Sequence, residues 1–156
     1  MIVLCRIDDR LVHGQVAFTW VPSLGADCLV VANDKVAADD FQKMALGLAA
    51  PRNVRQLILP VADVITFLND PSSQALKVLV LVKDVADAAR LSQGVAMLTS
   101  INFGGIRTRE GARLVSKAIA LTPGDIALAR ALLTKGIELE VRQVPTDTRQ
   151  RLENLL

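Results

Sequence analysis

Two kinds of hydrophobic pattern alternate along this chain of 156 residues. Short runs rich in Val, Ile and Leu are typical of buried strands, and longer segments with apolar residues every three or four positions are typical of amphipathic helices. The short runs are almost continuously apolar, as strands must be when helices cover both faces of a parallel sheet. The predicted strands are Ile2 to Ile7, Cys28 to Ala32, Arg55 to Leu59, Lys77 to Val82 and Met97 to Asn102, followed by two with weaker patterns, Lys117 to Leu121 and Ile137 to Arg142.

The last predicted strand alternates apolar with charged residues, which indicates an edge strand with one face in water. An exposed edge is a surface through which the chain could pair with a second copy of itself, so a homo-oligomer is allowed. Trp20 could serve the same purpose if it were exposed. We expect it instead to pack in the core, beneath the helix that follows the first strand.

Helical periodicity is clearest in Asp40 to Ala50, which Pro51 ends. One stripe of this segment carries Phe41, Met44, Ala45 and Leu48. We expect the stripe to pack on the sheet.

Capping residues mark the other helices. Thr122 is predicted as an N-cap with Pro123 at the first helical position, and Gly136 as the C-terminal cap of the same helix. Asp84 with Asp87 begins another helix, and Asp147 is predicted to begin the last. With right-handed crossovers, these elements assemble into one α/β domain over residues 1–156, with three layers: a mainly parallel sheet of about six or seven strands and helices on both faces.

Composition excludes several classes of function. The aromatic content of 3% and a net charge of +2 give little support to nucleic-acid binding. No apolar stretch approaches about 18 uninterrupted residues and no secretion signal is visible, so we expect a cytoplasmic protein without a membrane span. Cys5 and Cys28 lie in apolar runs, which suits reduced core residues, and no pattern predicts a metal or a nucleotide cofactor.

The densest polar run, Arg6 to Val16, falls between the first strand and a helix-like segment and contains His13, the only histidine. Ligands of open α/β sheets usually bind at such turns. A neutral imidazole can attack phosphorus, and the product carries roughly two negative charges that need a cation and N–H donors nearby. Arg10 is the candidate cation, and Asp8 or Asp9 could orient the ring through its other nitrogen.

The remaining candidates for binding phosphate are Arg6, Gly14, Gln15, Gly104 and Gly105. The free amides around Gly14 would face the anion if a helix begins there. Gly104 and Gly105 follow the fifth predicted strand, so they should emerge at the same sheet edge as His13. They would either let the backbone approach a phosphate closely or form a plain turn that needs positive φ.

The run from Arg6 to Val16 resembles the active-site segment of IIB components in the mannose/fructose/sorbose branch of the sugar phosphotransferase system. Other segments resemble that family in order and spacing, so the resemblance covers essentially the whole chain. They are Trp20, Lys43 to Leu46, Ala49 to Pro51, Ile101 to Ile106, Thr122-Pro123 with Asp125-Ile126, Lys135 to Glu138, and Val144 to Asp147. Phe103 departs from the Val or Ile expected before the double glycine.

The resemblance implies that His13 accepts a phosphoryl group on Nδ1 from a phosphohistidine of a IIA partner, with Arg10 close to the phosphate. It further implies transfer to a sugar that arrives through membrane IIC and IID subunits, and a location at the inner face of the membrane. Mannose, fructose, sorbose, N-acetylgalactosamine and other amino sugars all stay open as substrates.

Two other hypotheses compete with the phosphocarrier. A binding module could grip a phosphorylated ligand or an acidic partner loop with Arg6 to Val16, and it would tolerate His13→Gln with a modest loss of affinity. A hydrolase using His13 as general base is less well supported, because the G-x-S-x-G pattern is missing.

Overall fold

A seven-stranded sheet runs through the centre of the protein, described over residues 1–156 by a computed structural model. Its strand order is β3-β2-β4-β1-β5-β8-β9, and every neighbouring pair is parallel except β8 and β9. The strands are β1 (Ile2–Asp8), β2 (Cys28–Ala32), β3 (Arg55–Leu59), β4 (Val78–Val82), β5 (Ser100–Gly105), β8 (Glu138–Val141) and β9 (Gln150–Arg151). A separate antiparallel hairpin joins β6 (Arg113–Ser116) to β7 (Ile119–Leu121). The mainly parallel α/β architecture is therefore confirmed.

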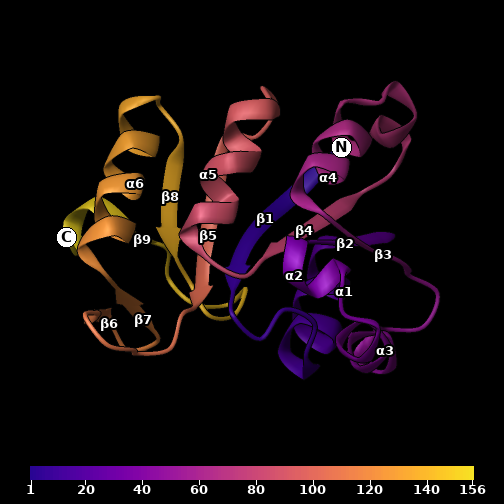
Figure 1. Ribbon diagram of the computed structural model, residues 1–156, viewed down its shortest axis with the longest axis horizontal. Coiled ribbons are helices and arrows are strands. Elements are labelled where there is room, and N and C mark those ends of the chain that lie inside the picture. Colours follow the sequence, from indigo (N-terminus) through magenta and orange to yellow (C-terminus); the bar gives the residue numbers. More distant parts are fainter.

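Helices cover both faces of the sheet. In Figure 1, α4 (Val61–Asn69), α5 (Val85–Gly94) and α6 (Pro123–Thr134) stand side by side in the upper half of the molecule, and they pack on one face of the sheet. The short helices α1 (Val21–Leu24) and α2 (Asp34–Ala37) gather at the lower right with α3 (Asp40–Ala49). The π-helix η1 (Val16–Trp20) leads directly into α1. The remaining helical segments are two short 3-10 helices, η2 (Pro71–Ala75) and η3 (Leu152–Asn154). No helix has the length and apolar character needed to cross a membrane.

Alternation along the strands divides the core in two. In β2, Cys28, Val30 and Ala32 face a cluster of 28 buried residues to which α4, α5 and α6 contribute. Leu29 and Val31 face a smaller cluster of 11 buried residues, which includes Trp20. Trp20 is therefore a core residue, as predicted.

The cysteines lie in the larger cluster on strands that are not neighbours. Cys5 belongs to β1 and Cys28 to β2, both are buried, and β4 lies between the two strands. Adjacent strands are about 4.8 Å apart, so two strands with a third between them hold their cysteines beyond the usual reach of a disulfide.

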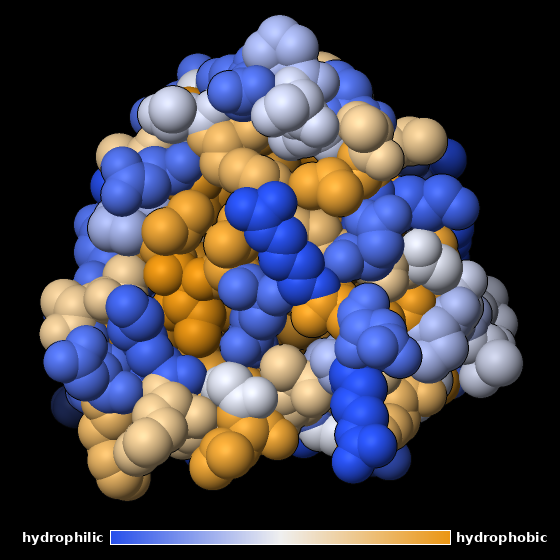
Figure 2. Space-filling view, turned by 90° about the vertical axis from the view of Figure 1, so that its right-hand side faces the viewer, coloured by the Kyte–Doolittle hydropathy of each residue, from blue (hydrophilic) through white to orange (hydrophobic).

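The apolar stripe of α3 points away from the sheet, contrary to the prediction. Phe41, Met44 and Leu48 are 74%, 62% and 85% exposed, and the helix packs instead through Leu46 and Ala49. The reason is tertiary: α3 lies beside α2, Gln56 of β3 donates to the carbonyl of Leu46 at 3.3 Å, and the side of the helix with Leu46 and Ala49 is the one that meets the smaller core cluster. Apolar surface accordingly lies along the lower left of the face shown in Figure 2.

The C-terminal prediction was also wrong. Asp147 lies in a turn, where its Oδ2 accepts the N–H of Val144 at 3.3 Å, and no helix begins there. A side chain that closes a local turn in this way competes with helix initiation. The chain continues into β9, which pairs with Glu140 and Val141, so β8 is not the edge strand that its alternation suggested.

Three other boundaries depend on local signals, and one strand depends on tertiary context. Thr122 caps α6 in a capping box with Asp125, and Gly136 follows the helix with a φ of +83°. Asp84 caps α5 by accepting the N–H of Asp87. All three predictions are confirmed. The predicted strand at Lys117 to Leu121 forms only as Ile119–Leu121, in the hairpin outside the main sheet.

Candidate functional site

The loop that carries His13 leaves the C-terminal end of β1 at the middle of the sheet. Leu11 and Val12 are buried in the smaller cluster, which pins the loop to the sheet while leaving Arg10 at the surface. Leu11 has a φ of +58°, a strained value for a residue with a branched side chain. The turn closes when its N–H donates to the carbonyl of Asp8 at 2.9 Å.

Asp8 contacts the imidazole directly. His13 Nε2 lies 2.9 Å from Asp8 Oδ2, and Nδ1 makes no hydrogen bond within the chain. An ionised carboxylate can only accept, so Nε2 carries the proton and the lone pair stays on Nδ1. The nitrogen with the free lone pair is therefore the nucleophilic one.

The electrostatics around Asp8 keep its carboxylate ionised. Burial by itself would raise the pKa of Asp8, but the hydrogen bond from His13 and the charge of Arg6 outweigh it and lower the pKa below its ordinary value. The backbone N–H of Arg10 also donates to Oδ1, at 3.1 Å. Asp8 is thus the hydrogen-bond centre of the loop.

Asp9 does not contact His13, which removes it as an orienting acid. Its Oδ2 accepts from the backbone N–H of Arg107 at 2.8 Å and from the Nε of the same residue at 3.2 Å. Asp9 therefore ties the loop after β5 to the loop after β1.

Arg6 is fully buried, which contradicts the prediction that it binds phosphate. Its Nη2 donates to Asp8 at 3.1 Å, and its Nη1 donates to Asn102 at 2.8 Å. The guanidinium also packs over Trp20, 5.0 Å from the ring centroid. Burial lowers the pKa of Arg6, while the carboxylate of Asp8 opposes that shift. An arginine stays protonated in such a setting, so it serves as the fixed counter-charge of Asp8.

The polar contacts of Arg6 continue across the sheet. In register, Arg6 on β1 pairs with Asn102 on β5, and Asn102 pairs with Glu140 on β8. Asn102 Nδ2 donates to Glu140 Oε1 at 3.1 Å, and Arg142 donates to the same oxygen at 3.1 Å. Sequence reasoning missed this row, because its members are far apart in the chain. Each of the three strands carries one polar residue of this row. Only the strand order shows that the three residues are neighbours.

The groups available to an anion belong to the same loop as His13. A helical turn begins at Gly14, where the carbonyl of His13 accepts the N–H of Ala17 at 2.9 Å. The N–H groups of Gly14 and Gln15 donate no hydrogen bond within the chain, as is usual for a first helical turn. The Arg10 side chain is half exposed and bound only weakly, by its Nε at 3.5 Å from Asp8.

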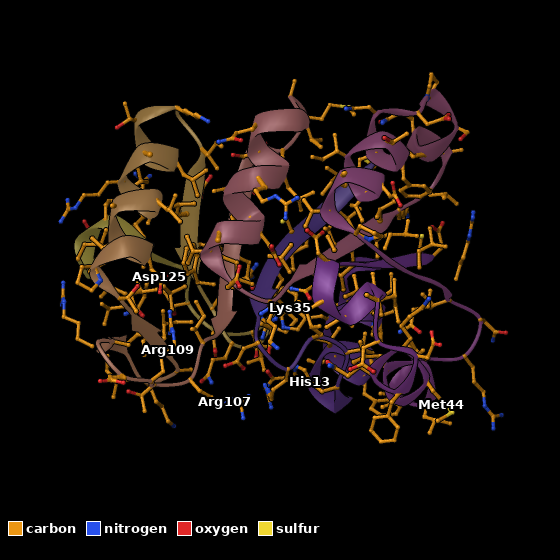
Figure 3. All side chains as sticks on the ribbon, viewed as in Figure 1. His13, Lys35, Met44, Arg107, Arg109 and Asp125 are labelled. Atoms are coloured by element: carbon orange, nitrogen blue, oxygen red, sulfur yellow. The ribbon has the colours of Figure 1, made fainter.

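A groove of about 670 Å³ starts at Arg10 and passes the end of β5. Gly104 and Gly105 line it, and Arg107 and Lys117 add positive charge to its walls. Neither glycine has positive φ and both belong to β5, so the interpretation as a plain turn was wrong. Figure 3 shows His13 near the lower edge of the molecule, between Arg107 on one side and the exposed Met44 of α3 on the other.

Comparison with known proteins decides the family. The model described as "PTS system sorbose subfamily IIB component", where PTS denotes the phosphotransferase system, matches residues 2–156. The chain belongs to this family. The resemblance noted in the sequence is thereby confirmed, and IIB components are phosphotransferases of the sugar-transporting phosphotransferase system.

Relatives and solved structures agree with this assignment. The IIB chain is 38% identical over 156 residues to the mannose-specific EIIAB component of Escherichia coli K12, covering 100% of this chain and 48% of that protein. It is 30% identical to the fructose-specific EIIB component of Bacillus subtilis 168, covering 99% and 95%. The IIBSor domain of the sorbose permease from Klebsiella pneumoniae superposes with a TM-score of 0.94 at 29% identity, covering 99% and 95%. The chain thus spans about half the length of the mannose-specific relative.

Proposed function

We propose that this IIB chain is a phosphocarrier that accepts a phosphoryl group on His13 Nδ1 from a phosphohistidine of a IIA partner. The observation that carries the proposal is the 2.9 Å contact between Asp8 Oδ2 and His13 Nε2. It holds the proton on Nε2 and leaves the Nδ1 lone pair free, in a loop that also carries Arg10 and the free amides of Gly14 and Gln15.

The transfer is an exchange of P–N bonds. The Nδ1 lone pair attacks the phosphorus, the bond to the donor imidazole breaks, and its electron pair returns to the donor. Asp8 stabilises the positive charge that builds on the His13 ring, while Arg10 and the free amides bind the phosphoryl oxygens. In-line transfer between two histidines needs mainly positioning and charge stabilisation, which an exposed loop can supply.

The second step passes the phosphoryl group to a sugar. A sugar hydroxyl attacks the phosphorus, its proton is released, and the electron pair of the P–N bond returns to Nδ1. In this proposal the sugar arrives through membrane IIC and IID subunits, and the IIB chain works at the cytoplasmic face of the membrane. The name EIIAB of the mannose-specific relative supports a IIA partner, and relatives named for mannose and for fructose leave the sugar open.

Phosphorylation of the purified chain tests the function. Incubation with phosphoenolpyruvate, enzyme I, HPr and a matching IIA protein should add one acid-labile phosphoryl group, seen by intact mass at neutral pH. His13→Gln should abolish the gain and keep the fold. Arg10→Ala should slow phosphorylation about 10- to 100-fold and change the free energy of unfolding by less than about 1 kcal/mol, because the side chain is half exposed.

The negative outcome is equally clear. If several IIA partners add no phosphate while a control IIB protein is phosphorylated, the chain is a binding module for phosphorylated ligands. If Arg10→Ala is phosphorylated at the unchanged rate, Arg10 does not bind the phosphate.

A further inference from the structure

Gly104 lies directly against the guanidinium of Arg6. A Cβ atom at this position would lie 2.0 Å from Arg6 Cζ and 2.3 Å from Nη2. Contacts shorter than 3.0 Å essentially never occur for real Cβ atoms, so one of the two groups would have to move. Gly104 has no positive φ, so its backbone conformation does not require a glycine. The lack of space for a side chain does.

The buried position of Arg6 costs free energy. The guanidinium has no access to solvent, and its Nε finds no hydrogen-bond partner. Buried ion pairs often stabilise a fold no better than apolar side chains of similar size. Stability therefore gives no reason for this arrangement, which makes a role in the geometry of the site the better explanation.

The contacts connect Arg6 to the His13 ring through one oxygen atom. Asp8 Oδ2 lies 3.1 Å from Arg6 Nη2 and 2.9 Å from His13 Nε2. Asn102 and the carbonyl of Arg142 accept from Arg6 Nη1 at 2.8 and 3.1 Å, so the guanidinium is fixed from its far side. A shift of the Arg6 guanidinium would either move the Asp8 carboxylate or break the ion pair between the two side chains.

We propose that Gly104 and Arg6 are positioning residues for His13. Gly104 provides the slot in which the guanidinium lies flat, and Arg6 holds Asp8 so that the carboxylate keeps the proton on Nε2 and the lone pair on Nδ1. This proposal rests on the proposed function, because a fixed Nδ1 matters only if that nitrogen takes the phosphoryl group.

The test compares two glycines that are both crowded. Gly104→Ala inserts a methyl group into Arg6, and Gly94→Ala at the end of α5 inserts one 2.7 Å from Ile65 Cγ2, against the other face of the sheet. Both variants are compared with the wild type at a temperature where denaturation curves show them folded. Nitrogen-15 NMR of the unphosphorylated chain reports which ring nitrogen of His13 carries the proton, and rapid quenching gives the phosphorylation rate.

We expect Gly104→Ala to mix the two tautomers of His13 and to slow phosphorylation about 100-fold, since a misplacement of about 1 Å has effects of this size. Gly94→Ala should keep the wild-type tautomer and rate. If Gly104→Ala matches Gly94→Ala in both measurements, the positioning role is wrong. Because the tautomer is measured without any partner, its outcome is separate from failure of the proposed function, in which even the wild type takes no phosphate.

A second variant covers the case in which Gly104→Ala fails to fold. Arg6→Lys keeps the charge and loses the planar fork, so it should also mix the tautomers and slow transfer. The double variant Arg6→Lys with Gly104→Ala should be no slower than Arg6→Lys alone, because the clash needs the guanidinium. Additive effects of the two changes, or a wild-type tautomer in Arg6→Lys, would overturn the proposal.

Discussion

At the residue scale, Asp8 combines two environments that oppose each other. It has no solvent exposure, which disfavours its charge, yet four donor contacts from Arg6, Arg10 and His13 favour the ionised form. The net effect is a pKa below the ordinary value. The charge that orients His13 is therefore also a charge on which the fold depends.

Asp8→Asn should destabilise the protein by about 3 kcal/mol at pH 7, because it leaves Arg6 buried without its counter-charge. A carboxylate with a lowered folded pKa contributes stability that is present above its unfolded pKa, about 3.9, and lost as the pH falls through the folded value. Urea denaturation should show a constant difference between wild type and variant from about pH 5 to 8 and a shrinking one below about pH 4. A difference that grows on acidification would show that the pKa of Asp8 is raised.

At the element scale, α3 shows that an amphipathic pattern does not say which side a helix buries. Its strongest stripe faces solvent, and the packing side holds Leu46 and Ala49. The pattern predicted the helix and its start at Asp40 correctly, and its end at Ala50 only one residue too late. What it could not show is which side of the helix meets the smaller core cluster, because that depends on the placement of α3 beside α2.

Leu48→Glu should therefore change the free energy of unfolding by less than about 0.5 kcal/mol. Leu46→Glu, on the packing side of the same helix, should cost about 2 kcal/mol or more, because it buries a charge against apolar neighbours. Thermal or urea denaturation of the two variants gives the comparison. Equal losses would mean that the stripe is buried in solution.

At the scale of the whole molecule, the strand order places β1 in the middle of the sheet, between β4 and β5. The same strand therefore carries the site at its C-terminal end and a fully buried thiol, Cys5, near its centre. Burial raises the pKa of Cys5 to about 12. A thiol of this kind is unreactive until the sheet opens.

In a Cys28→Ser background, Cys5 should react with an aromatic disulfide reagent at pH 8 no faster than the protein unfolds globally. The reaction rate should then rise with urea along the unfolding limb of the folding kinetics. Rapid labelling in the absence of urea would show that β1 opens locally.

The sequence by itself determined what depends on neighbouring residues. Apolar runs located every strand of the main sheet except β9, capping residues located α5 and α6, and the polar run after the first strand located His13. Each of these follows from hydrogen bonds and side-chain periodicity within a few positions, which the sequence shows directly.

Only the tertiary structure decided what depends on distant partners. Arg6 and Asn102 are 96 positions apart, and Asn102 and Glu140 are 38 apart, so their contact follows from strand order and not from spacing. The same holds for the different partners of the two acids in the loop: Asp8 contacts His13, and Asp9 contacts Arg107. Sequence placed both acids close to the histidine. The tertiary structure chose between them: Asp8, two residues after Arg6 on the same strand, is buried and meets Arg6 and His13 together, whereas Asp9 meets Arg107.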